Sequence, residues 1–140
     1  MAEYVRKFRC QVITPEKQLG PFEAVSVIFP AADGQVGVLN DRAPLIALLG
    51  AGPLRIRSID GRLTEYFVSG GFAQVRQNVT TILTEQCVPL SELDAAAAQK
   101  ELDEAHAMSA GSPEAVALRA AAAASAKTKL RLAREQGGKG

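Results

Sequence analysis

Few side chains in this 140-residue chain could do chemistry, and none stands in a catalytic pattern. His106 is the only histidine, and it lies among alanines without a second metal ligand or a group to orient its ring. Cys10 and Cys87 are too few for a disulfide framework and lack the spacing of metal ligands. We therefore expect no catalytic residue, no metal site and no cofactor. The two thiols are expected to stay reduced in a cytosolic compartment, as small apolar side chains of strands.

Aspartates and glycines fall in turns rather than in binding motifs. Asp33, Asp41 and Asp60 occupy turn contexts, where an aspartate bonds to nearby backbone. The glycine-rich residues 34–37 are not a phosphate loop, because no Gly-Lys-Ser/Thr follows them. The pair Gly70-Gly71 indicates a bulge or close packing. By its own residues the chain is a coupling or binding module.

Overall composition excludes several classes of protein. The formal net charge is +1, without the cationic surplus of a nucleic-acid binder. Hydrophobic residues make up 47% and charged residues 22%, which are values of a globular chain. No run approaches the ~20 apolar residues that span a bilayer, and the first residues lack the apolar core of a secretory signal. We expect neither secretion nor membrane spanning.

The elements that position these residues change in kind near residue 90. Residues 1–90 hold 21 Val, Ile and Thr and all seven aromatic residues, whereas residues 91–140 hold two Val, Ile and Thr and 16 alanines. Branched and aromatic side chains suit strands, and alanine suits helices. The sequence predicts an all-β sandwich over 1–88 and an antiparallel two-helix hairpin over 89–140, with helices at about 91–110 and 113–136.

Alternation and turn signals locate the strands. Two runs each place apolar side chains on one face, namely Tyr4, Phe8, Cys10 and Val12 in the first and Val25, Val27 and Phe29 in the second. The clearest hairpin joins 54–59 to 63–68 through Asp60-Gly61, for which we predict a type I′ turn.

Capping signals locate the helices. Ser91 is the expected N-cap of the first helix, with Asp94 three residues on, and Ser112-Pro113 begins the second. The second helix is expected to end at Gly137-Gly138. One apolar stripe is expected to face the partner helix: Ala95, Ala98, Leu102, Ala105 and Met108.

Charge is segregated on the predicted hairpin, with a net of −4 over 91–110 and +4 over 111–140. One interpretation is that the two helices neutralise each other through exposed pairs, worth ~0–1 kcal/mol each. The other is that the basic helix leaves its partner for an acidic surface elsewhere. An alanine seam buries little apolar area, so the hairpin is expected to be weakly closed.

The order of several short motifs resembles a known family. The run Gly34–Leu45 reads GQVGVLNDRAPL, Ser69-Gly70-Gly71 leads to Val75, and Asn78-Val79-Thr80 follows. Together they are similar to the epsilon subunit of F-type ATP synthases, over nearly the whole chain. The resemblance implies a β-sandwich followed by two helices, which agrees with the elements predicted above.

The resemblance also implies a role. It implies a non-catalytic subunit of the rotating central stalk, on the cytoplasmic face of the bacterial inner membrane and attached only through the complex. The sandwich would contact the gamma subunit and the c-ring, so that proton flow is coupled to ATP synthesis. The hairpin would extend along gamma and bring its basic helix to an acidic segment of a catalytic beta subunit, which restrains ATP hydrolysis.

By position, the resemblance assigns Gln35 and Arg42 to the rotor interface. The candidate inhibitory contacts are Arg119, Lys127, Lys129, Arg131 and Arg134. Two positions depart from the family pattern. Arg42 stands where histidine is common, which weakens the case for a pH-sensitive contact there.

The second departure concerns ATP. Some members bind ATP through a motif at the first helix, which reads here Leu93, Asp94, Ala97 and Ala98, with Ala97 in place of the motif's arginine. A second partial match to the motif, Leu102–Ala107, begins nine residues later and has His106 at the arginine position. The missing guanidinium removes a strong phosphate donor, so we expect no tight ATP binding.

Two other functions compete with the stalk subunit. One is a free-standing sandwich adaptor or purely structural coupling subunit without inhibitory activity, in which the hairpin is a fixed cap. The other is a small enzyme, which the absence of a catalytic constellation disfavours.

Overall fold

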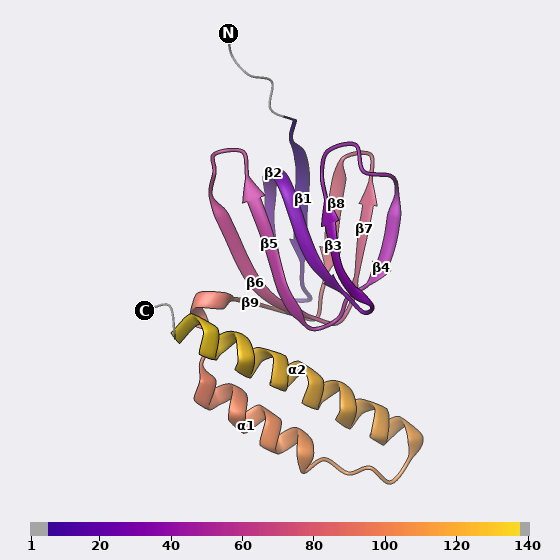
Figure 1. The fold of residues 1–140 in the computed structure, drawn as a ribbon. Coiled ribbons are helices and arrows are strands. Elements are labelled where there is room, and N and C mark those ends of the chain that lie inside the picture. Colours follow the sequence, from indigo (N-terminus) through magenta and orange to yellow (C-terminus); the bar gives the residue numbers. More distant parts are fainter. Residues whose placement is uncertain (1–5, 138–140) are drawn as a thin grey trace. The chain divides into compact units, whose positions relative to one another are not determined.

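The computed structural model describes residues 6–137, which divide into two compact units between Cys87 and Val88. The first unit is built of strands and the second of helices (Figure 1). The predicted all-β sandwich followed by a helical hairpin is confirmed. Among the described residues, no helix is both long and apolar enough to cross a membrane.

The strands follow one another through short turns. They are β1 Phe8–Ile13, β2 Gln18–Ala31, β3 Gly34–Val38, β4 Leu45–Leu48, β5 Gly52–Ser58, β6 Leu63–Ser69, β7 Phe72–Arg76, β8 Val79–Leu83 and β9 Gln86–Pro89. Their order in the sheet is β4-β7-β8-β1-β2-β5-β6-β9, with β3 also paired to β2. The first strand lies in the middle, parallel to β8 and antiparallel to β2.

The sheet folds back on itself around one apolar core. The long strand β2 pairs with β1, β3 and β5, and its end meets β4, where Ala32 N–H donates to the Leu48 carbonyl at 2.9 Å. As predicted, Phe8, Cys10 and Val12 are buried together; Tyr4, predicted on the same face, lies outside the described residues.

A bulge changes the expected face of β2. Val27 and Phe29 are fully buried, but the buried residue that precedes them is Ala24, and Val25 is only half-buried. The register against β5 shifts between Ala24 and Ser26. The extra residue in the bulge breaks the two-residue period, so the prediction for Val25 was wrong.

The hairpin β5–β6 was placed correctly, but its turn type was wrong. Gly61 alone in that turn has a positive φ, and its N–H donates to the Ser58 carbonyl at 2.9 Å. This is a type I turn followed by a glycine in the left-handed region. Asp60 instead accepts a bond from the Arg62 N–H at 2.9 Å. A two-residue loop with both φ values positive is found at Gln77-Asn78, between β7 and β8.

The paired glycines lie between β6 and β7, with φ of +77° at Gly70 and +92° at Gly71. A Cβ on Gly71 would overlap the Leu83 carbonyl oxygen and lie 3.0 Å from the Thr84 Cα. The predicted close packing is therefore confirmed, and it is backbone against backbone.

The second unit contains a short 3₁₀ helix η1 (Leu90–Glu92), α1 (Ala95–His106) and α2 (Pro113–Gly137). Asp94, not Ser91, caps α1, because its carboxylate accepts from the Ala96 N–H at 3.2 Å while residues 90–92 form the 3₁₀ turn. Ser112 caps α2 as predicted, through a 3.1 Å bond from the Ala115 N–H. Gly138, in the predicted helix stop, lies outside the described residues.

The seam between α1 and α2 is small. Its buried residues are Ala98, Leu102, Ala126 and Leu130, with Ala95 and Ala123 packed against them. Met108 was predicted in the stripe but is 39% exposed, because α1 has ended before it. The alanine-rich character of the seam is as predicted, and only two of its side chains are larger than alanine.

Candidate docking surface

No cluster of three or more His, Cys, Asp or Glu able to hold a metal ion occurs among residues 6–137. Cys10 is fully buried, and burial raises the pKa of its thiol to about 12. Burial likewise raises the pKa of Cys87 to about 11. Both thiols are therefore poor nucleophiles at neutral pH.

The unusual surface of the sandwich is an apolar patch on its outer side. Ile46 and Leu48 of β4 are 72% and 70% exposed, and Phe72 of β7 is 44% exposed. Leu48 pairs with Phe72, and Phe72 pairs with Leu83 of β8. Cross-strand partners lie on the same face of a sheet. We call these four residues the apolar face.

The alternating residues of β4 and β7 explain why the face is exposed. Leu45, Ala47, Ala73 and Val75 point into the core, so the intervening residues must point outward. Further along β7, the outward residues are Gln74 and Arg76. The outward side of these strands therefore has the apolar face beside polar residues, as is typical of a protein–protein contact.

The docking loop, residues 39–44, precedes the apolar face and carries Arg42. The Arg42 N–H donates to the Leu39 carbonyl at 3.2 Å, which closes a turn. The Arg42 side chain is exposed. Gln35, the other predicted rotor contact, is also exposed but lies near the start of β3, whereas Arg42 lies past its end. The structure therefore does not bring the two together.

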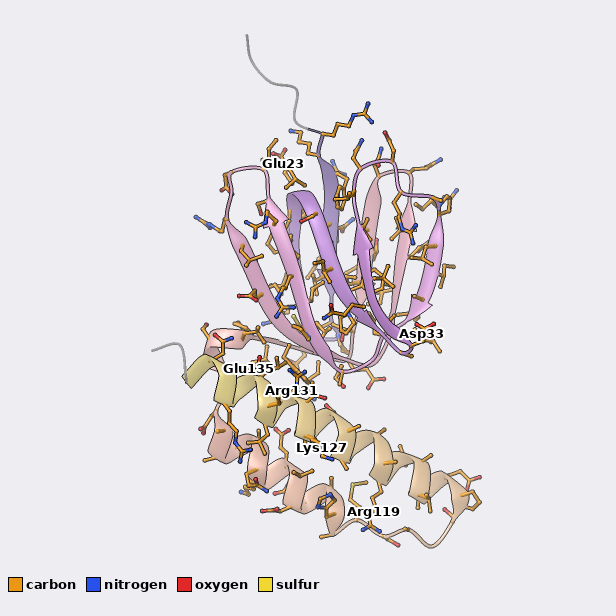
Figure 2. All side chains as sticks on the ribbon, viewed as in Figure 1. Glu23, Asp33, Arg119, Lys127, Arg131 and Glu135 are labelled. Atoms are coloured by element: carbon orange, nitrogen blue, oxygen red, sulfur yellow. The ribbon has the colours of Figure 1, made fainter. Side chains whose placement is uncertain are left out.

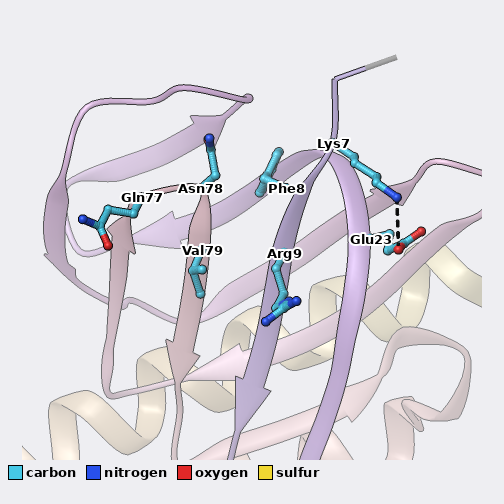
Figure 3. Close-up of a pocket in the computed structure, with 7 residues that line it drawn as sticks. All are labelled: Lys7, Phe8, Arg9, Glu23, Gln77, Asn78 and Val79. Carbon is cyan, nitrogen blue, oxygen red and sulfur yellow. Dashed lines mark hydrogen bonds and ion pairs between the residues drawn. The ribbon is translucent and has the colours of Figure 1, made fainter. Parts of the chain in front are cut away.

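An open groove of about 370 Å³ lies beside the turn between β7 and β8 (Figure 3). Lys7, Arg9 and Glu23 line it on one side and Gln77 and Asn78 on the other. Lys7 donates to Glu23 at 3.2 Å across the exposed rim. Because the charges of Lys7 and Glu23 compensate each other, the groove has no cluster of like charges. The groove is therefore a weak candidate site for an ionic ligand.

The predicted inhibitory residues of α2 have different environments. Lys127 and Arg131 are exposed and Arg119 is half-buried (Figure 2). Arg134 is also exposed. Arg131 pairs with Glu135 at 3.0 Å, one turn along the helix. Lys129 differs, because it is only 8% exposed and its ammonium donates to both carboxylate oxygens of Glu101 on α1, at 2.9 and 3.1 Å.

The degenerate ATP motif has structural roles in this hairpin. Asp94 is the N-cap of α1, and Ala98 is buried in the seam. Ala97, at the arginine position, is exposed. A phosphate at this place would meet no guanidinium from the motif.

The sequence prediction missed the apolar face. Ile46 and Leu48 carried a signal, because β4 has only apolar residues and therefore no polar side to turn to solvent. Phe72 carried no such signal, because Gln74 and Arg76 give β7 a polar side. Asn78, whose side chain bonds to the docking loop, was named only as part of a motif.

Comparisons with known proteins agree on one family. The model of the ATP synthase delta/epsilon chain β-sandwich domain matches residues 7–90. The ATP synthase epsilon chain of Rhodopirellula baltica is 42% identical over 126 residues, which are 90% of this chain and 98% of that protein.

Two solved structures share the fold. One is a chain of the Euglena gracilis mitochondrial ATP synthase (TM-score 0.74, 24% identity, 87% of this chain and 78% of that one). The other is a chain of the central stalk and c-ring structure of the Tetrahymena thermophila enzyme (TM-score 0.67, 19% identity, 93% and 96%).

Proposed function

The chain belongs to the ATP synthase delta/epsilon chain family, and we propose that it is the non-catalytic epsilon subunit of the central stalk of an F-type ATP synthase. In this role it couples proton flow through the c-ring to ATP synthesis in the catalytic head. It lies at the cytoplasmic face of the bacterial inner membrane, attached through the complex. The observation that carries the proposal is the apolar face, an exposed surface with the character of a protein contact.

We assign the apolar face and the docking loop to the gamma subunit and c-ring. The loop leads directly into β4, so Arg42 and the exposed Ile46 and Leu48 belong to one continuous segment. Gln35 lies apart from this segment and is assigned to a separate rotor contact. The surface offers apolar area for affinity and an exposed cation for orientation.

Phe72→Glu is expected to weaken binding to the gamma subunit by roughly 100-fold, because a carboxylate must then be desolvated in an apolar contact. The measurement is the dissociation constant between the full chain and gamma. Leu63→Glu is the matched control, since Leu63 is 43% exposed and lies on β6, several strands away in the sheet. Equal effects of the two substitutions would remove the apolar face from the interface.

We further propose that the hairpin restrains ATP hydrolysis by carrying its basic helix to an acidic segment of a beta subunit. The small alanine seam supports a hairpin that can open. The exposed cations Lys127, Arg131 and Arg134 support an acidic partner. A structural coupling subunit without inhibition is the alternative.

Removing residues 112–140 is expected to raise ATP hydrolysis by the assembled head several-fold, because the whole basic helix is lost. A second variant replaces Arg119, Lys127, Arg131 and Arg134 by Gln and keeps Lys129, so that the hairpin seam stays intact. Both variants should raise hydrolysis if charge carries the contact. If hydrolysis is unchanged in both variants, the inhibitory role is excluded and only the structural coupling role remains.

A further inference from the structure

A reciprocal pair of hydrogen bonds joins the docking loop to a distant turn. The Asp41 N–H donates to Asn78 Oδ1 at 2.7 Å, and Asn78 Nδ2 donates back to Asp41 Oδ1 at 3.1 Å. Because the Asp41 backbone N–H can only donate, it must face the oxygen and not the nitrogen of the Asn78 side-chain amide. These two residues are 37 positions apart in the chain.

Asn78 is itself held in place from a third segment. Its carbonyl accepts from the Arg9 N–H of β1 at 3.0 Å, and Figure 3 shows Asn78 in its turn beside Phe8 and Arg9. Gln77 and Asn78 both have positive φ, 50° and 60°. This tight two-residue turn fixes the direction in which the Asn78 side chain leaves the backbone.

The loop end of the pair is equally specific. Asp41 has a φ of +64° and is the third residue of the turn that the Arg42 N–H closes onto Leu39. A positive φ at this place belongs to a type II turn, where a side chain other than glycine needs local support. Arg6 adds a 2.9 Å ion pair to the other Asp41 carboxylate oxygen, but both side chains are largely exposed.

We infer that Asn78 is a positioning residue for docking: its clamp on Asp41 holds the loop 39–44 in one conformation before the rotor partner arrives. Leu39 and residues 41–44 are exposed. Within residues 6–137, the side-chain hydrogen bonds that tie this loop to other segments all involve Asp41. The inference rests on the proposed docking of this loop onto the rotor. Ordering a loop in advance lowers the entropy lost on binding.

The test compares Asn78→Gly and Asp41→Asn with the wild-type full chain. Glycine adopts the positive φ of residue 78 without strain, so Asn78→Gly removes the clamp but keeps the turn. Asp41→Asn keeps the backbone donor and the Oδ1 acceptor, and asparagine tolerates the left-handed region. It is therefore the conservative variant that preserves the clamp.

Asn78→Gly should leave the melting temperature within a few degrees of wild type, yet speed amide hydrogen exchange at Asp41 by at least roughly 10-fold, because the amide loses its acceptor. Dissociation from the gamma subunit should become roughly 10-fold faster, because the loop must then be ordered on binding. The factor corresponds to the cost of immobilising about one side chain. Asp41→Asn should match wild type in both measurements.

Each outcome decides something. Unchanged exchange at Asp41 in Asn78→Gly would overturn the clamp. Faster exchange with unchanged dissociation would overturn its role in docking. A wild-type chain that does not bind gamma would overturn the proposed function instead, and the exchange comparison would still decide whether the clamp holds the loop.

Discussion

Replacing Gly71 by alanine is expected to destabilise the sandwich by about 4 kcal/mol or more, enough to unfold many domains of this size. The new Cβ would overlap the Leu83 carbonyl oxygen and lie 2.8 Å from the Leu83 carbonyl carbon. These are backbone atoms at the end of β8, so they cannot turn aside as a flexible side chain can. The φ of +92° at Gly71 adds a further cost for any residue with a Cβ.

Urea denaturation followed by tyrosine fluorescence measures this effect, since both tyrosines precede residue 87. Gly37→Ala is the matched control, because a Cβ at Gly37 meets nothing within 4 Å. It should change the free energy of unfolding by less than about 1 kcal/mol. Gly70→Ala should fall between the two, because its Cβ would meet the Glu85 side chain at 3.2 Å, which can move. Equal stability of Gly71→Ala and Gly37→Ala would contradict the close backbone approach.

Glu101→Gln is expected to weaken closure of the helical hairpin by about 1–2 kcal/mol, a roughly 5- to 30-fold larger open population. Lys129 is 11% exposed at its side chain, so its ammonium has lost most of its water, and the Glu101 carboxylate compensates part of that loss. Glu101 is 47% exposed, and solvent screening lowers the effect below that of a fully buried pair. The alanine seam has little apolar area with which to offset the loss.

The distance between spin labels on two exposed residues, Ala97 of α1 and Ala124 of α2, measures hairpin closure. Glu135→Gln is the control, because it removes the carboxylate of an exposed pair on the same helix, with 58% and 49% of the Arg131 and Glu135 side chains exposed. Lys129→Met should leave closure unchanged or stronger, since it replaces the buried charge with an apolar side chain of similar length. If Glu101→Gln and Glu135→Gln have the same open population, the Lys129–Glu101 pair does not hold the hairpin. In the proposed function, Glu101→Gln would also deepen the restraint on ATP hydrolysis.

The classes of secondary structure could be predicted because they depend on local composition. The branched and aromatic residues before residue 90 predict strands and the alanines after it predict helices, and the structure has both in these places. Details that depend on one competing hydrogen bond could not be predicted. Asp94 displaces Ser91 as the cap of α1, and the Gly61 N–H selects a type I turn over type I′.

The candidate site could be predicted only in part, since its parts meet through tertiary pairing. The motif containing Arg42 was recognised, but the bond between Asp41 and Asn78 joins two turns with no common sequence pattern. Period-two alternation places Phe72 and Leu48 on one side of their strands without saying which side faces solvent. The sequence prediction grouped Lys129 with the exposed cations of α2, although Lys129 is buried. Its burial depends on which residues of α1 lie opposite it, and the sequence of α2 alone does not show them.

The central position of β1 has a consequence for biosynthesis. The first strand to leave the ribosome forms its parallel ladder with β8, from Arg9 opposite Val79 to Ile13 opposite Leu83. The nascent chain cannot complete its middle strand pair until about 70 further residues have been translated, so we expect the sandwich to form late and in one step. A chain stalled before residue 79 could pair β1 with β2 but would leave the other flank of β1 without β8. Such an unpaired strand edge is a site for aggregation or for chaperone binding.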